Sequence, residues 1–177
     1  MRMFFALWPD ADTRARLAEV TATSRLTGAA RAVARENYHL TLAFVGEVAV
    51  SQLAVLQQIG RSQQGSGCTI RLDACEHWQD ARVLVAVARE TPAALIELWT
   101  RVQAALNLRH PEAALRAHVT LARKVAQAPV LQAMSPIYWS AKSFSLVRSD
   151  TRGPHSVYTV VDTWPLLDET TTPEKSL

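Results

Sequence analysis

One short pattern occurs twice in this chain, and the repeat constrains the fold more strongly than any other feature. The segment NYHLTLAF contains His39 and the segment RAHVTLARK contains His118, so both have the order His-x-Thr-Leu-Ala. In a β-strand, residues i and i+2 point to the same face. We therefore expect His39 and Thr41 to share one face of a strand, and His118 and Thr120 to share one face of another. The aliphatic residues between them would then face the core.

Apolar and amphipathic segments alternate along the rest of the chain. The apolar segments predict strands over residues 2–8, 38–45, 68–78, 82–88, 116–124, 139–148 and 157–164. The amphipathic segments predict helices that begin at Pro9, at a Ser51 N-cap and at Thr91, and that end near residues 26, 61 and 106. This order is typical of an α+β fold with mainly antiparallel sheets and outer helices. Placing the two motif strands side by side gives a bilobal fold with a central groove and pseudo-two-fold symmetry.

The composition is that of a globular chain. It has 177 residues, of which 49% are hydrophobic, so it can bury a core without metal or disulfide support. We expect residues 1–167 to form one bilobal domain and residues 168–177 to form a flexible tail. No apolar run approaches the roughly 20 residues that span a membrane, and the first residues are too short an apolar stretch for a secretory signal. The chain is therefore expected to be a cytoplasmic protein, a monomer without a membrane partner.

The two cysteines are expected to be free thiols. Cys68 and Cys75 fall in one predicted strand, which would place them about 23 Å apart at ~3.3 Å per residue. A disulfide needs Cα atoms within roughly 7 Å. Free thiols agree with a reducing compartment.

The residue types of the repeat suit phosphoryl chemistry. Imidazole titrates near ~6.5, so one histidine can accept a proton from water while the other donates one to a leaving oxygen. Threonine hydroxyls can donate hydrogen bonds to phosphate oxygens. The net charge is +3. Basic side chains gather around the second motif, which favours an anionic ligand: Arg109, His110, Arg116, His118, Arg123 and Lys124.

A structural reading competes with this catalytic one. A single His-x-Thr in a strand is usually a half-buried histidine beside a sheet threonine, and a basic cluster is usually a solvated face. Two copies among only five histidines are hard to assign to chance. His77, His110 and His155 have no such neighbours, and we interpret them as surface or locally bonded. Neither motif carries the partner ligands of a metal site, so we expect no metal and no cofactor.

At these residues the sequence resembles the 2H phosphoesterases, which are named for two His-x-Thr/Ser motifs. It is most similar to the RNA 2′,3′-cyclic phosphodiesterases, also called 2′-5′ RNA ligases. The opening RMFFALW, both motif segments and the closing SFSLVRSDTRGPHSVYTVVDTWPL carry the resemblance over nearly the whole chain. The resemblance implies a bilobal α+β fold with the active site between the lobes. It also implies hydrolysis of a terminal 2′,3′-cyclic phosphate of RNA to a 2′-phosphate, without metal, in RNA processing.

The resemblance also implies roles for single residues. His39, Thr41, His118 and Thr120 would be catalytic, with His39 as the acid to the leaving 3′ oxygen and His118 as the base to water; reversal of the reaction exchanges the two roles. Phe44 and Arg123 follow their histidines by five positions and would bind the substrate, Phe44 by stacking on a base and Arg123 by contacting base or phosphate.

Strict strand alternation places these two positions on the face opposite to the histidines. A bend or bulge near Ala43 and Ala122 would have to redirect them. The alternative is that Phe44 lies in the core and Arg123 on the solvated surface.

Other activities stay open at this point. Ligation of 2′-5′ RNA ends uses the same groups. A binding module for a nucleotide or a 2′-5′ oligonucleotide would use the groove without turnover, although a binder does not need both imidazoles. Hydrolysis of a small cyclic phosphate is the remaining alternative to an RNA substrate, and the modest net charge is compatible with it.

Overall fold

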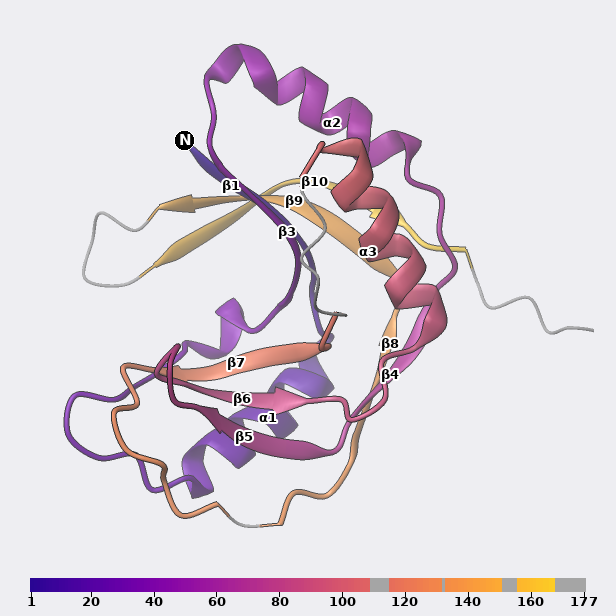
Figure 1. The fold of residues 1–177 in the computed structure, drawn as a ribbon. Coiled ribbons are helices and arrows are strands. Elements are labelled where there is room, and N and C mark those ends of the chain that lie inside the picture. The colour runs from indigo at the N-terminus through magenta and orange to yellow at the C-terminus, as the bar shows by residue number, and fades with distance from the viewer. Residues whose placement is uncertain (109–114, 132, 151–155, 168–177) are drawn as a thin grey trace, which may run out of the picture.

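The structure is a computed structural model that describes residues 1–108, 115–131, 133–150 and 156–167. The predicted tail at 168–177 and the predicted turn at 151–154 lie outside these residues, as do Arg109, His110 and His155. Two four-stranded sheets face each other, one in each lobe (Figure 1). All the strand pairs within the described sheets are antiparallel, which confirms the predicted α+β class.

The first sheet has the strand order β10-β9-β1-β3. Its strands are β1 (Arg2–Leu7), β3 (Leu40–Glu47), β9 (Ser143–Asp150) and β10 (Val157–Pro165). The second sheet has the order β2-β7-β6-β5. Its strands are β2 (Arg31–Ala32), β5 (Ala74–Trp78), β6 (Val83–Val87) and β7 (His118–Arg123). Each sheet thus holds one of the two motif strands, β3 in the first and β7 in the second.

A two-stranded sheet of β4 (Cys68–Leu72) and β8 (Ile137–Ala141) links the lobes. The predictions of single strands over 68–78 and 139–148 are therefore wrong, because each segment breaks where the chain leaves the linking sheet for a lobe. At the first break, the Asp73 carboxylate accepts a hydrogen bond from the Arg89 N–H at 3.1 Å and pairs with Arg71 at 2.9 Å. At the second break, the Leu166 N–H donates to the Lys142 carbonyl at 2.8 Å. As a result, Cys68 and Cys75 lie in different sheets, and no disulfide joins them.

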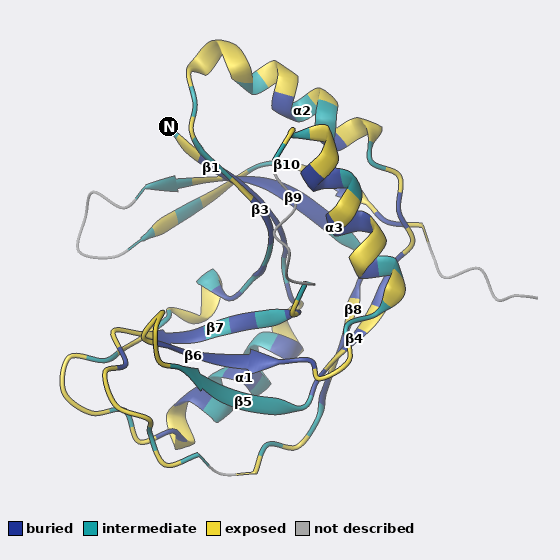
Figure 2. Cartoon of the chain, viewed as in Figure 1, coloured by how far each residue is buried: buried dark blue, intermediate teal, exposed yellow. Residues whose placement is uncertain are grey.

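Two of the helices pack against a different sheet from the one whose strand precedes them in the chain. Helix α1 (Ala11–Thr23) follows β1 of the first sheet but packs against β7 and β8, whereas α3 (Ala93–Ala105) follows β6 of the second sheet but packs against β3. Helix α2 (Leu53–Ser62) packs against β9 and β10 (Figure 1). This exchange joins the two lobes through one continuous core. Strands β1 and β6 are buried along almost their whole length, with alternate side chains in this core and the others in two smaller clusters (Figure 2).

Most of the remaining differences between the predicted and the observed elements concern where the helices begin and end. The Asp10 side chain accepts from the Thr13 N–H at 2.8 Å and caps α1, which ends at Thr23 rather than near residue 26. Ser51 is not an N-cap, because it lies inside a 3₁₀ turn, η2 (Val50–Gln52), that precedes α2. A second 3₁₀ turn, η1 (Arg35–Asn37), leads into the first motif, and the two-residue strand β2 was not predicted. None of the described helices is long and apolar enough to cross a membrane.

Candidate active site

The two motif segments have the same burial pattern, residue for residue. The segments run from His39 to Phe44 and from His118 to Arg123. In both, the histidine and the threonine are half-buried, the aliphatic residue between them and the Leu-Ala pair after them are buried, and the last residue is exposed. The aliphatic residues Leu40 and Val119 face the core, as alternation predicts. Each motif therefore presents an imidazole and a hydroxyl on the side away from the core.

Each motif strand also contains a β-bulge at the same position. In the pairing of β1 with β3, Phe5 pairs with Ala43 and Ala6 with Thr41, so Leu42 has no partner. A bulge inserts one extra residue and restarts the alternation after it. Phe44, opposite Phe4, therefore shares a face with Thr41 despite their spacing of three.

The second motif repeats this geometry. In the pairing of β6 with β7, Leu84 pairs with Ala122 and Val85 with Thr120, so Leu121 has no partner. Arg123, opposite Val83, returns to the face of Thr120. The predicted bulges are confirmed.

The bulges explain why the side chains of Phe44 and Arg123 lie outside the core. Its side chain is 66% exposed, so the alternative that it lies in the core is wrong. Arg123 is exposed as well, and it lies on the histidine face of its own strand. Both positions that the resemblance assigns to substrate binding therefore lie beside the motif side chains.

Main-chain hydrogen bonds hold both imidazoles in one orientation. His39 Nδ1 lies 2.7 Å from the Asn37 carbonyl oxygen, and His118 Nδ1 lies 2.8 Å from the Arg116 carbonyl oxygen. Because a carbonyl oxygen can only accept, Nδ1 carries the proton and donates in both residues. In the neutral form, Nε2 of each histidine is then the nitrogen that can accept a proton, as a general base must.

His39 is enclosed by aromatic rings. The indole of Trp8 stacks on it at 5.2 Å between centroids with an interplanar angle of 14°, while Phe4 lies at 5.1 Å and Tyr158 meets it edge-on at 5.2 Å. Burial among these rings lowers the pKa of His39 to about 4, and the positive charges of Arg123 and His118 add to this, while the bond to Asn37 opposes it. His39 is therefore neutral at neutral pH in the free protein.

His118 has a different neighbourhood. Its ring lies 4.6 Å from that of Trp78, and the guanidinium of Arg116 lies 5.3 Å from the Trp78 ring centre. Glu76 holds both neighbours, because it accepts from Trp78 Nε1 at 2.8 Å and from Arg116 at 2.9 and 3.0 Å. Burial lowers the pKa of His118, and the charges of Arg116 and Arg123 act in the same direction.

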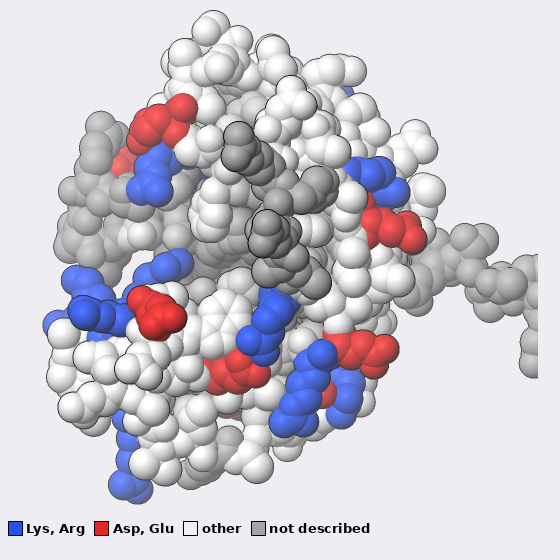
Figure 3. All heavy atoms as spheres, in the orientation of Figure 1, with Lys and Arg blue, Asp and Glu red and all other residues white. Residues whose placement is uncertain are grey.

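These charges show that the two motifs meet. The His118 charge contributes to the pKa of His39, and Arg123 contributes to the pKa of both histidines. Strands β3 and β7 contact each other, and the surface is hollowed between the lobes (Figure 3). The two motifs therefore bring together two imidazoles with available Nε2 atoms, two hydroxyls and one guanidinium, a set that can transfer protons and bind an anion.

Sequence reasoning missed the residues that surround the histidines. These residues are Trp8, Trp78, Glu76 and Tyr158. They lie in or beside predicted strands, where aromatic residues are usually part of the core, and no signal in the sequence marks which face of a strand lines a groove. The interpretation of His77 as locally bonded is confirmed, because its Nε2 lies 2.9 Å from the Val125 carbonyl oxygen.

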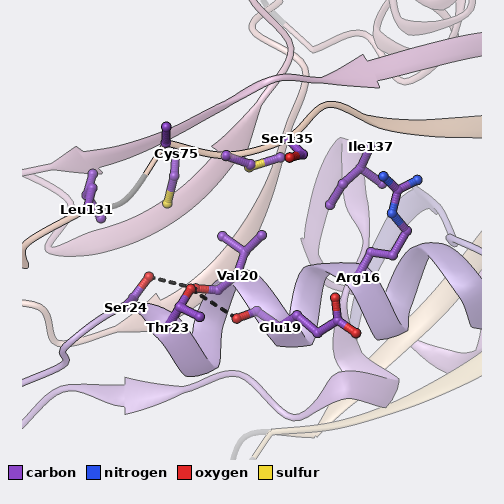
Figure 4. A pocket seen from close by; sticks show the side chains of 11 residues that line it. Arg16, Glu19, Val20, Thr23, Ser24, Cys75, Leu131, Ser135 and Ile137 are labelled. Atoms are coloured by element: carbon purple, nitrogen blue, oxygen red, sulfur yellow. Dashed lines mark hydrogen bonds between the residues drawn. The ribbon is translucent and has the colours of Figure 1, made fainter.

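The other features of the described residues lie away from this site. No group of three or more histidine, cysteine, aspartate or glutamate side chains in the described ranges is placed to hold a metal ion. A cavity of about 260 Å³ lies between α1 and residues 131–137 (Figure 4). Cys75 lines it, and burial raises the pKa of that thiol to about 11, so it is protonated and unreactive at neutral pH. Cys75 alternates with Glu76, which places the cavity behind the sheet that carries His118.

Comparison with known proteins finds relatives that cover nearly the whole chain. The family described as LigT like phosphoesterase matches residues 7–85. The RNA 2′,3′-cyclic phosphodiesterase of Escherichia coli is 31% identical over 93% of this chain and 96% of its own length. The protein of the same name from Thermus thermophilus is 27% identical over 96% of this chain and 92% of its own length. The crystal structure of E. coli LigT complexed with 3′-AMP superposes with a TM-score of 0.83 at 27% identity, covering 93% of this chain and 97% of that one.

Proposed function

Because this chain belongs to the LigT-like family of 2H phosphoesterases, we propose that it hydrolyses the 2′,3′-cyclic phosphate end of RNA to a 2′-phosphate with its two histidines and without a metal ion. The observation that supports this best is the duplicated motif geometry. Both copies have the same burial, the same bulge after the threonine and the same Nδ1 hydrogen bond to the main chain. A structural role for a histidine does not require two matched imidazoles that face one hollow.

The reaction balances with these groups alone. The base takes a proton from water as the water oxygen bonds to phosphorus. The bond between phosphorus and the 3′ oxygen breaks, and the acid gives its proton to that oxygen. The product has a 3′-hydroxyl and a 2′-phosphate. Thr41 and Thr120 donate hydrogen bonds to the phosphate oxygens on which negative charge increases in the transition state.

We assign His39 as the acid and His118 as the base, as the family resemblance implies. The low pKa of His39 adds a condition, since an acid must hold a proton before it can donate one. The negative charge of the bound phosphate favours the imidazolium and raises its pKa. Substrate binding therefore brings the proton to His39 in this mechanism.

Substrate contacts complete the site. Phe44 is exposed on the histidine face of its strand, where its ring can stack on a base. Arg123 occupies the equivalent position of the second motif, and its charge lowers the pKa of both imidazoles. Its guanidinium can therefore contact the phosphate between them. If an RNA 5′-hydroxyl takes the place of water, the same groups form a 2′-5′ linkage instead.

The test is single-turnover hydrolysis of an oligonucleotide that ends in a 2′,3′-cyclic phosphate, with the position of the product phosphate identified by NMR. His39→Ala and His118→Ala should each lose roughly 10²–10⁴-fold in rate. The double variant should lose much less than the product of the two, because residues that act as a unit are not additive. Thr41→Val and Thr120→Val should lose less than either histidine variant, since each loses a hydrogen bond rather than a proton carrier. Circular dichroism confirms that each variant folds.

A substrate with sulfur in place of the 3′ oxygen separates the two histidine roles. A thiolate leaves without protonation, so this substrate should restore the rate of His39→Ala and not that of His118→Ala. Rescue of His118→Ala instead would exchange the two roles. A folded single-histidine variant with near-normal turnover would contradict the mechanism and leave a binding module as the better interpretation.

A further inference from the structure

Each motif histidine has a tryptophan ring against its imidazole, and each of these tryptophans is anchored through its indole N–H. Trp8 lies 5.2 Å from His39 between ring centres, and its Nε1 donates to a main-chain carbonyl at 3.2 Å. Trp78 lies 4.6 Å from His118, and its Nε1 donates to the Glu76 carboxylate at 2.8 Å. The arrangement thus occurs once for each motif, but the second anchor is a side chain.

The strand register explains why the Trp78 ring needs an anchor. Trp78 pairs with Val83 of β6, whereas His118 pairs with Val87 at the other end of the same strand. The indole packs against the buried cluster of Val83, Val85 and Val87, and it therefore reaches His118 by lying along β6. Apolar packing has no direction, and a valine side chain offers no partner to an indole N–H. A hydrogen bond from another residue must fix where the ring lies on these valines.

Glu76 supplies that hydrogen bond from the middle of the sheet. It pairs with Val85, which pairs in turn with Thr120, so its side chain points to the face of the motif side chains. The bond from Trp78 is the main cause that lowers the pKa of Glu76, and the bonds and charge of Arg116 act in the same direction. The carboxylate is therefore ionised at neutral pH, and a hydrogen bond to a charged acceptor is stronger than one between neutral groups.

Arg116 connects the same carboxylate to the other contact of the imidazole. Its guanidinium donates to Glu76 at 2.9 and 3.0 Å and lies 5.3 Å from the centre of the Trp78 ring. Its carbonyl oxygen lies 2.8 Å from His118 Nδ1. The two contacts that orient the His118 imidazole, the bond at Nδ1 and the Trp78 ring, thus both lead back to Glu76.

The ion pair itself contributes little to the stability of the fold. The side chain of Glu76 is 34% exposed and that of Arg116 is 56% exposed. Exposed pairs of this kind are weak, because water screens the charges and two long side chains lose conformational freedom. Removal of the carboxylate should therefore change the position of the imidazole more than it changes folding.

We infer that Glu76 is a positioning residue for His118, because it holds the Trp78 ring and the Arg116 side chain that orient the imidazole. This inference rests on the proposed function, in which His118 is the base. A base must present Nε2 to the attacking water, and a misplacement of about 1 Å can lower a rate by up to ~10²-fold. Glu76 accepts no proton and contacts no reacting atom in this role.

The experiment removes the carboxylate and measures hydrolysis of an oligonucleotide that ends in a 2′,3′-cyclic phosphate. Glu76→Leu should lower kcat about tenfold, and KM should not change because Phe44 and Arg123 are intact. Glu76→Gln keeps an oxygen that can accept from Trp78, so it should lose clearly less. Glu97→Leu is the matched control, since it removes an exposed carboxylate that pairs with Arg101 on α3 at 4.0 Å, and it should keep the wild-type kcat.

A second pair of variants tests whether Glu76 acts through Trp78. Trp78→Phe keeps an aromatic ring but cannot donate a hydrogen bond, so it should lower kcat as Glu76→Leu does. The double variant should lose no more than Glu76→Leu alone, because the two substitutions remove one shared interaction. Losses that multiply in the double variant would overturn the inference. Circular dichroism checks folding, and Glu76→Gln with Trp78→Phe carries the test if Glu76→Leu does not fold.

NMR of the imidazole tests the positioning without any turnover. The Trp78 ring current shifts the Hε1 resonance of His118, which the spectrum of His118→Ala identifies. In Glu76→Leu this resonance should move, whereas that of His39 should not. An unmoved His118 resonance, an equal loss of kcat in Glu97→Leu, or a raised KM at unchanged kcat would overturn the inference.

Failure of the proposed function gives a different result. If the wild-type protein hydrolyses no cyclic phosphate, the proposed function fails, but the NMR comparison still applies. A His118 resonance that moves in Glu76→Leu and in Trp78→Phe, but not in Glu97→Leu, supports the positioning role, and an unmoved resonance overturns it.

Discussion

The indole of Trp8 stacks on the imidazole of His39, with 5.2 Å between the ring centres and an angle of 14° between the planes. Trp8 is itself fixed, because its Nε1 donates to the Glu36 carbonyl at 3.2 Å. The stack covers one side of the imidazole with an apolar surface, and burial disfavours the charged form of a histidine. The protonation state of His39 thus depends on a residue outside both motifs.

Removal of this ring should raise the pKa of His39. In Trp8→Leu, the smaller side chain admits water to the imidazole, so the pKa should rise from about 4 toward the ordinary value near 6.5. An NMR titration of the histidine Hε1 resonances measures it. Trp78→Leu is the control, since Trp78 borders His118 and should leave the pKa of His39 unchanged. An unchanged pKa in Trp8→Leu would assign the desolvation to Phe4 and Tyr158.

The same burial should make folding stability depend on pH. The pKa of His39 is about 4 in the folded protein and about 6.5 in the unfolded chain, so between these values the unfolded state binds the proton and the folded state does not. The free energy of unfolding should therefore fall as the pH falls through this window, by up to roughly 3 kcal/mol from His39 alone. Above the window this residue contributes no pH dependence.

Urea unfolding across this window checks the expected slope, and His39→Gln should flatten it because glutamine does not titrate. The lowered pKa of His118 acts in the same direction, so part of the slope should persist in the variant. Identical slopes for the wild-type protein and for His39→Gln would contradict the buried, neutral state of His39.

The repeat predicted the two motif strands because it supplied two independent copies of one pattern. The bulges followed from the family resemblance, which assigns Phe44 and Arg123 to substrate binding although strict alternation would point them away from the histidines. The sequence did not predict the breaks at Asp73 and Lys142, because strand-like segments with apolar residues stand on both sides of each position and a single charged residue does not mark a change of sheet. The positions of Trp8 and Trp78 beside the histidines could not be predicted either, since the sequence of a strand does not show whether an aromatic residue faces the core or a groove. The Arg31–Ala32 strand is too short to carry any periodicity.

Chelation should not affect activity. The proposed proton transfers use two imidazoles, and the described residues contain no cluster of three metal-binding side chains. Hydrolysis of an oligonucleotide that ends in a 2′,3′-cyclic phosphate should be as fast in excess EDTA as in untreated buffer. Loss of activity on chelation, restored by adding back a divalent ion, would exclude a mechanism that depends on His39 and His118 alone.

Gly60 should not accept a larger side chain. Alanine usually stabilises a helix interior by up to about 1 kcal/mol relative to glycine. At Gly60 of α2, a methyl group would overlap the ring of Trp164, which packs against Phe5 and Phe144. Gly60→Ala should therefore destabilise the protein by about 1–3 kcal/mol in urea unfolding. Gln58→Ala, at an exposed position of the same helix, should not. Equal stabilities would show that Trp164 can move aside at little cost.

Phe44 and Arg123 occupy equivalent positions of the two motifs, so their variants should separate stacking from charge. Arg123→Ala should raise KM for an oligonucleotide that ends in a 2′,3′-cyclic phosphate and flatten its salt dependence, because one cationic contact is lost. Phe44→Leu should raise KM without changing the salt slope, since stacking on a base involves no counterion release and is worth about 1–3 kcal/mol per base. Steady-state kinetics at several salt concentrations measure both effects. Phe44→Tyr is the control, because it keeps the aromatic face and should keep a normal KM. If Arg123→Ala leaves both KM and the salt slope unchanged, Arg123 belongs to the solvated surface, and the bulge that turns it toward His118 has no role in substrate binding.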